Sequence, residues 1–272
     1  MEEKTNRRKE ERTEHKRASK LIFISCIVVA FLVVIGLLSS LALLLFPVKQ
    51  IEVWGDSRYS YTEIIEVSGI KRGARLYYVN TNKAEQRVLS ALPYLKNVEI
   101  ESYFPNKVKI TIKEFEDIYL IRHERGFCYV NSDFEILEIV PDAPSYEEFS
   151  GICIKLEKKA SGEIGEKYEY EDAQRATVLI DYIKKYGFYS YLNIVDVDEK
   201  YNNSFVVGKR YKFVIGAMAD VEEKINASFK VVLSDEFKRE ENCIIDSTDR
   251  KKVISRYVND EIIRQEFDFC EK

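Results

Sequence analysis

The hydrophobic and polar positions divide the chain into one long apolar run and a longer remainder of short periodic segments. Residues 21–46 form a run of 26 positions without a charged side chain. As an α-helix this run would be about 39 Å long, against about 30 Å for the hydrocarbon core of a bilayer. The apolar region of a signal peptide is usually only about 7–15 residues long. We therefore predict an uncleaved transmembrane helix at residues 21–46, in contact with the lipid bilayer.

Basic residues flank this run on one side only. Residues 1–20 carry eight Lys or Arg side chains, whereas residues 47–66 carry two. Positive charge stays on the cytoplasmic side of a membrane. We therefore expect residues 1–20 to form a cytoplasmic basic tail of a single-pass protein of the cell membrane, with the C-terminus extracytoplasmic.

After the apolar run, the pattern predicts a first unit over residues 47–115. Val48–Trp54 alternates as a strand does, and so do residues 98–101 and 108–113 around a turn at residues 104–106. Two capping-box patterns predict helices between these strands. They are Ser60 with Glu63, and Asn82 with Glu85. The predicted order of this unit is β-α-α-β-β.

A second unit, residues 116–258, is predicted to be rich in strands and to contain two helices. The helices are expected at 172–185 and 221–233, the latter capped by Asp220 with Glu223. Strands are expected at 118–122, 127–130, 134–139, 191–197, 205–208, 211–215, 243–246 and 253–258. Residues 259–272 are predicted to be a charged, frayed C-terminal tail. The predicted fold class is therefore α+β, with one N-terminal transmembrane helix.

The composition argues against several classes of function. The residues after 46 carry 34 basic and 41 acidic side chains, a net charge of −7, which argues against nucleic-acid binding. With only two His residues and no C-x-x-C pair, we predict no metal site, no cofactor and no small-molecule substrate. The four cysteines beyond the apolar run, whose disulfide state the sequence leaves open, are expected to be free buried thiols. They are Cys128, Cys153, Cys243 and Cys270.

Two patterns resemble chemical sites. Ser68-Gly69-Ile70-Lys71 fits the S-x-x-K pattern of penicillin-binding enzymes, but Ser68 is predicted to end a helix rather than begin one. Asp196, Asp198 and Glu199 could suggest a Ca²⁺ site, although a solvated strand end explains them better. We predict that the protein is not an enzyme.

Several segments resemble the FtsQ/DivIB bacterial cell-division proteins, in particular their POTRA domain. They are Ile51-Glu52-Val53-Trp54-Gly55, Ile64–Ile70, Leu92-Pro93-Tyr94-Leu95-Lys96 and Tyr103–Glu114. In the second unit, Tyr129-Val130-Asn131, Phe213–Gly216 and Ile244-Ile245-Asp246 resemble the family's β-domain. With the basic tail and single span, the resemblance covers nearly the whole chain.

The resemblance implies a non-catalytic scaffold of the divisome at the division septum. Its extracytoplasmic domains would bind single-span partners of the FtsL and FtsB/DivIC types and support septum formation. A membrane-anchored cell-envelope enzyme is the alternative, but it would need a nucleophile and a base that the sequence does not show. A POTRA chaperone for secretion would normally repeat the module, which occurs here once.

The candidate partner-binding site is the last predicted strand, because a strand at the edge of a sheet can accept a further strand. Alternation would place its residues on two faces. Val253, Ser255 and Tyr257 would share one face, and Ile254, Arg256 and Val258 the other. The resemblance places Tyr257 near an aromatic residue that the family uses against its partner. Tyr257 could equally cover the domain's own core.

Overall fold

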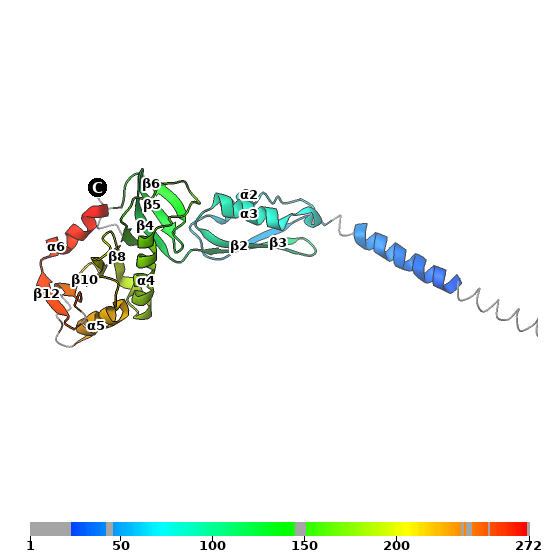
Figure 1. Ribbon diagram of the computed structural model, residues 1–272. Coiled ribbons are helices and arrows are strands. Elements are labelled where there is room, and N and C mark those ends of the chain that lie inside the picture. The colour runs from blue at the N-terminus through cyan, green and yellow to red at the C-terminus, as the bar shows by residue number, and fades with distance from the viewer. Residues whose placement is uncertain are drawn as a thin grey trace, which may run out of the picture. The chain divides into compact units, whose positions relative to one another are not determined.

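The chain contains an apolar helix and two compact units (Figure 1). This computed structural model describes residues 23–41, 46–144, 151–234, 237, 241–249 and 251–270. The first unit comprises Met1–Ala91 and Asn97–Lys113, and the second comprises Leu92–Lys96 and Glu114–Lys272. The predicted α+β fold class, with a strand-rich C-terminal region, is confirmed.

The apolar helix, Phe23–Leu41, has 19 residues and a mean hydropathy of 2.8, and none of it is buried by the rest of the protein. Its length of about 29 Å matches the hydrocarbon core of a bilayer. It is therefore long and apolar enough to span a membrane. Both limits of the predicted span, and the basic tail at 1–20, lie outside the described residues.

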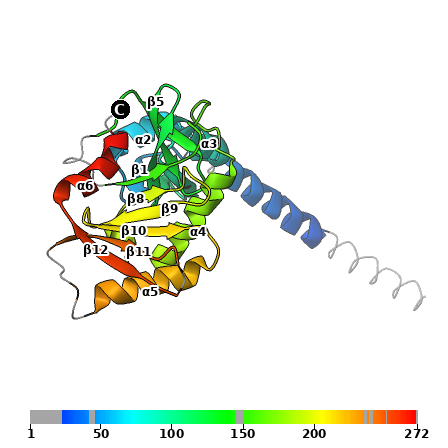
Figure 2. The same ribbon diagram turned by 60° about the vertical axis from the view of Figure 1, so that its left-hand side comes forward.

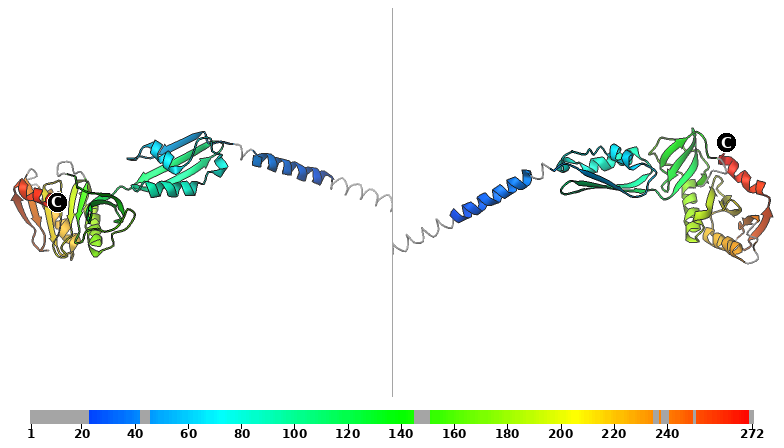
Figure 3. Two further views of the ribbon diagram at one scale, coloured as in Figure 1. Left: turned by 90° about the horizontal axis from the view of Figure 1, so that it is seen from above. Right: turned by 180° about the vertical axis from the view of Figure 1, so that it is seen from behind.

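The first unit has the predicted β-α-α-β-β order, with two helices on one face of a three-stranded sheet (Figure 3). Its elements are β1 (Gln50–Trp54), α2 (Tyr61–Ser68), the 3-10 turn η1 (Leu76–Tyr78), α3 (Thr81–Ala91), β2 (Leu95–Tyr103) and β3 (Lys107–Glu114). The strand order is β1-β3-β2, and β1 is parallel to β3. Val108, Ile110 and Ile112 alternate with more exposed neighbours, so one face of β3 forms the core.

The helix starts of the first unit confirm one capping prediction and correct the other. Ser60 caps α2 by accepting a hydrogen bond from the Glu63 amide at 3.2 Å. The α3 cap, however, is Asn80, whose Oδ1 accepts from the Lys83 amide at 3.0 Å. Glu85 instead accepts from the Ile100 amide at 2.7 Å. Asn80 is followed three residues later by Lys83 and not by an acidic residue, so the capping-box pattern indicated Asn82 instead.

The second unit is built on a nine-stranded sheet with the order β12-β11-β10-β9-β8-β7-β4-β5-β6 (Figure 2). The predicted hairpins at its start are confirmed as β4 (Ile118–His123), β5 (Gly126–Asn131) and β6 (Ile136–Val140). The remaining strands are β7 (Ile152–Lys155), β8 (Leu192–Asp196), β9 (Asn203–Val207), β10 (Tyr211–Gly216), β11 (Asn242–Asp246) and β12 (Ile254–Val258). Sequence periodicity did not predict β7, which pairs in parallel with β4 and β8.

Each face of this sheet is covered by different helices. The two predicted helices, α4 (Glu171–Lys185) and α5 (Val221–Leu233), pack in the larger core with inward residues such as Ile121, Phe205 and Phe213. Residues in alternation with these, such as Leu120 and Val206, pack in a second core on the opposite face. The sheet is therefore buried on both faces over these strands.

The predicted frayed tail is wrong for residues 259–270. Asp260–Arg264 form a short helix, α6, and Gln265–Cys270 form the 3-10 turn η3. Ile263 and Phe267 are buried in the second core. Their spacing of four residues places them on one side of a helical turn, although charged residues surround them in the sequence. Burial of this apolar pair explains why the segment packs against the sheet.

Candidate partner-binding edge of the second unit

The predicted partner-binding strand lies at an edge of the nine-stranded sheet (Figure 2). β12 covers five of the six predicted residues, and Val253 immediately precedes it. β12 pairs antiparallel with β11, with Tyr257 opposite Cys243 and Ile254 opposite Asp246. In the described residues, no further strand pairs with the other side of β12. One row of its backbone groups therefore faces away from the sheet.

The two faces of β12 have the predicted composition. On the face of the larger core, Val253 packs against that core, and the Tyr257 ring lies 6.0 Å from the ring of buried Phe237. On the opposite face, Val258 packs against the second core. Tyr257 contacts a core residue and is 37% exposed. This geometry is compatible both with a role in partner binding and with a role in covering the core.

The middle of the strand is open to solvent. Ile254 is 49% exposed, and Ser255 and Arg256 are also exposed. Covering an apolar side chain such as Ile254 with a partner removes apolar surface from water and so stabilises the complex. The structure thus brings a backbone edge together with two partly exposed apolar side chains, Ile254 and Tyr257.

Charged side chains hold the segment after β12 against the sheet. Glu266 of η3 accepts from Lys212 at 2.6 Å and lies 3.5 Å from the Lys155 ammonium. Lys155 also pairs with Asp196 at 3.4 Å. Burial by itself would lower the pKa of Lys155, but the charges of Asp196 and Glu266 raise it above its usual value. The expected solvated strand end is confirmed for Asp198 and Glu199, which are exposed, but it is wrong for Asp196, whose side chain is only 15% exposed and pairs with Lys155 of β7.

The catalytic-looking motif is part of a turn. Ser68 is buried at the end of α2, where its hydroxyl donates to the Ile65 carbonyl at 2.6 Å and accepts from the Ile70 amide at 3.2 Å. Lys71 is exposed. Both hydrogen-bonding roles of the Ser68 hydroxyl are therefore used to end the helix.

Metal ligands and thiols are further candidates for a chemical site. The described residues contain no group of three or more His, Cys, Asp or Glu side chains that could hold a metal ion. Cys128, Cys153 and Cys243 are free and buried, as predicted. Burial raises the pKa of the Cys128 thiol to about 12, which favours the protonated form over the nucleophilic thiolate at neutral pH. The side chain of Cys270 lies outside the described residues.

Sequence reasoning missed the structural roles of two residues of the second unit, Phe237 and Lys224. Phe237, whose ring contacts that of Tyr257, lies between α5 and β11, where the sequence shows no periodic pattern. Lys224 was counted as part of a helix, yet its ammonium is buried and donates to the carbonyls of Ile215 and Ala217, at 3.1 and 2.8 Å. Its position inside the apolar stripe of α5 was the available signal. Lys224 anchors α5 to the end of β10.

Comparison with known proteins identifies the first unit. Residues 46–115 match the family described as POTRA domain, FtsQ-type. This range contains all five predicted elements of the β-α-α-β-β unit. We refer to the first unit below as the POTRA unit.

Several proteins to which the chain is similar are named as cell-division proteins. The cell division protein DivIB of Clostridium acetobutylicum is 28% identical over 193 residues, covering 70% of this chain and 74% of the relative. DivIB of Clostridium botulinum (strain Hall) is 24% identical over 231 residues, covering 81% and 86%. The cell division protein FtsQ of Corynebacterium glutamicum is 29% identical over 118 residues, covering 43% and 51%. Together with the POTRA match and the apolar N-terminal helix, these similarities support an FtsQ/DivIB-type cell-division protein.

Proposed function

We propose that this protein is a non-catalytic scaffold of the bacterial divisome. It binds single-span partners of the FtsL and FtsB/DivIC types through its extracytoplasmic units and thereby supports septum formation. The proposal rests on the similarity to DivIB and FtsQ proteins and on the occupation of the Ser68 hydroxyl in a turn. A membrane-anchored cell-envelope enzyme has no observation in its favour.

The proposed segments of the chain are arranged in order from the cytoplasm outward. Residues 1–20 form the cytoplasmic tail, 21–46 the membrane span, 47–115 the POTRA unit, and the β-domain begins at 116. Because α6 packs against the sheet, the β-domain extends beyond residue 258. The whole region after the span is extracytoplasmic, and the protein is located at the division septum.

The observation that carries the proposed mode of partner binding is the edge position of β12. A partner segment in extended conformation can add to this edge, since backbone hydrogen bonds provide affinity and side-chain contacts provide specificity. Residues Val253–Val258 are the proposed contact. Tyr257 is the proposed anchor, because a tyrosine can bury a large area at a small cost in conformational entropy.

The test is the binding of the full-length Tyr257→Ala protein, in detergent, to the extracytoplasmic segment of a DivIC-type partner. We expect Kd to rise at least about tenfold, equivalent to about 1.4 kcal/mol. The melting temperature should change little, because Tyr257 is partly exposed and its contact with Phe237 lies at the margin of the core.

Tyr201→Ala is the matched control, since Tyr201 is an exposed tyrosine in the turn before β9, away from β12. It should leave both Kd and melting temperature unchanged. Equal affinity of the Tyr257→Ala and wild-type proteins would reject β12 as the docking edge. A large decrease in melting temperature would instead assign Tyr257 to the core.

A further inference from the structure

Three segments that are far apart in the sequence form one end of the POTRA unit. We call residues 46–49, 71–78 and 103–107 the POTRA base. Backbone hydrogen bonds join them. The Val48 amide donates to the Ala74 carbonyl at 2.7 Å, the Leu76 amide to Phe46 at 3.0 Å, and the Lys49 amide to Asn106 at 2.8 Å. The POTRA base is therefore a single, ordered surface.

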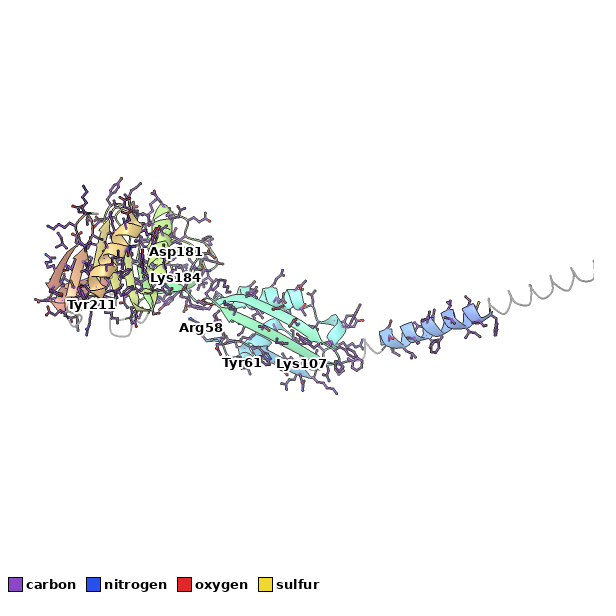
Figure 4. The ribbon with its side chains drawn as sticks, turned by 90° about the horizontal axis from the view of Figure 1, so that it is seen from below. Arg58, Tyr61, Lys107, Asp181, Lys184 and Tyr211 are labelled. Carbon is purple, nitrogen blue, oxygen red and sulfur yellow. The ribbon has the colours of Figure 1, made fainter. Side chains whose placement is uncertain are left out.

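The POTRA base is strongly basic. It contains five basic and no acidic residues, although the chain after residue 46 has a net charge of −7. The basic residues are Lys49, Lys71, Arg72, Arg75 and Lys107. Lys107, at the start of β3 (Figure 4), pairs with Glu52 at 2.6 Å. Within the part of the chain that the structure describes, the other four form no ion pair.

A cleft continues this basic surface. It has a volume of about 480 Å³ and lies between the end of α2 and the start of α3. Lys71, Arg75, Lys83 and Arg87 contribute to its lining, and no acidic residue does. Clustered Lys and Arg side chains of this kind attract phosphate groups, which carry negative charge and accept several hydrogen bonds.

Exposed aromatic side chains lie beside these charges. Tyr77 is 67% exposed and Phe104 is 63% exposed, and Tyr78 is similarly open. The Phe104 ring contacts the Phe46 ring edge-on, at a centroid distance of 4.8 Å. Tyrosine is enriched where a protein meets the headgroup region of a bilayer, because its ring is apolar and its hydroxyl is polar.

The covalent chain keeps the POTRA base near the membrane. Phe46 follows the last described residue of the apolar helix, Leu41, by five positions, and the residues between them are apolar. Five residues span at most about 18 Å even when fully extended. The surface that adjoins the anchor is thus also the one that carries the basic and aromatic side chains.

We propose that the POTRA base binds the membrane surface, with its basic side chains on the anionic headgroups of phospholipids. The exposed tyrosines and Phe104 enter the interfacial region beside them. At physiological salt, the attraction between basic side chains and anionic headgroups acts over about 8–10 Å. The short linker allows the POTRA base to come within this distance of the headgroups. The bilayer then restrains the POTRA unit at its base, independently of any protein partner at β12.

The test uses the full-length protein in lipid nanodiscs. The chain has a single tryptophan, Trp54, so the double substitution Trp54→Phe, Tyr77→Trp places the only tryptophan in the POTRA base. Quenching of its fluorescence by lipids brominated in the acyl chains reports contact with the bilayer. The discs contain either phosphatidylcholine alone or an equal mixture of phosphatidylcholine and phosphatidylglycerol.

We expect stronger quenching in the anionic discs. Adding Lys71→Gln, Arg72→Gln and Arg75→Gln should reduce the difference between the two discs at least about twofold, because these side chains provide the attraction to headgroups. The matched control removes the same charge from three exposed residues of the β-domain, by Lys159→Gln, Lys230→Gln and Lys251→Gln. It should leave the quenching unchanged.

Equal quenching in the two discs would overturn the proposal. The proposal would also fail if the triple substitution in the POTRA base left the difference between the discs unchanged. An equal effect of the control would assign the attraction to net charge rather than to this surface, and would also overturn it. All six substituted side chains are exposed, so folding is not the expected cause of any difference.

Discussion

At the scale of single residues, Asp117 shows how polar side chains stabilise the β-domain. Its Oδ2 accepts a hydrogen bond from the Lys184 ammonium of α4 at 2.6 Å, and Tyr189 donates to its other oxygen. Figure 4 places Lys184 on α4 one turn after Asp181. Burial raises the pKa of Asp117, but the hydrogen bonds from Lys184 and Tyr189 outweigh it, so the pKa lies below the usual 3.8.

We predict that Asp117→Asn destabilises the β-domain in a pH-dependent way. Because the pKa of the carboxyl is lower in the folded state, its stabilisation is present above about pH 4 and is lost as the pH falls through the folded pKa. The substitution should lower the free energy of unfolding by about 1 kcal/mol at pH 7, since the pair is partly exposed to solvent. Urea unfolding at pH 7 and pH 3 measures this difference. An equal effect at both pH values would contradict the role of the ionised carboxylate.

At the scale of elements, strand alternation decides which side chains enter the POTRA core. Ile110 of β3 is fully buried, between the partly exposed Lys109 and Thr111. Its strand lies in the middle of the three-stranded sheet, with β1 and β2 on either side. A change at this position therefore affects the whole unit.

We predict that Ile110→Glu unfolds the POTRA unit, because burying a carboxylate without a partner costs several kcal/mol. Fluorescence of Trp54, which pairs with Thr111 next to this residue, reports the loss of structure. Lys113→Glu places the same side chain at an exposed position of β3 and should leave the unit folded. A folded Ile110→Glu unit with unchanged Trp54 emission would refute the assigned core face.

At the scale of the whole molecule, the apolar helix and its flanking charges determine where the two units work. The eight basic residues before the helix favour a cytoplasmic N-terminus. In the proposed orientation, the POTRA unit and the β-domain face the cell envelope. This orientation is the condition for binding extracytoplasmic segments of partner proteins.

We predict that protease added to intact protoplasts removes residues after 46, while an epitope placed at residue 1 remains protected. A cytoplasmic protein detected in the same sample controls for lysis. Protection of the region after residue 46 would reverse the orientation. A mature N-terminus at Leu43 would show cleavage after Ala42 and exclude a permanent anchor.

Much of the fold follows from local sequence patterns. The apolar stripe of Ala173, Ala176, Ile180 and Ile183 sufficed to predict α4, and alternation sufficed to predict β3. Ser60 sufficed for the start of α2, because a cap involves only residues within one turn. The strand of the candidate site, Val253–Val258, was likewise predicted from a local pattern, and its limits agree with the observed strand within one residue.

What tertiary structure alone decided are the contacts between distant segments. β7 has only four residues, and it is recognisable as a strand through its parallel neighbours β4 and β8. Ile263 and Phe267 are apolar residues in a charged segment, and they form α6 and η3 against the sheet because its second face needs cover. The edge position of β12 likewise depends on which strands pair, and pairing of distant strands is not encoded in local periodicity. Sequence by itself determined most of the elements, the apolar helix and the family resemblance, whereas nonlocal packing determined β7, the helical segment after β12, and which strand edge and charged surfaces remain open.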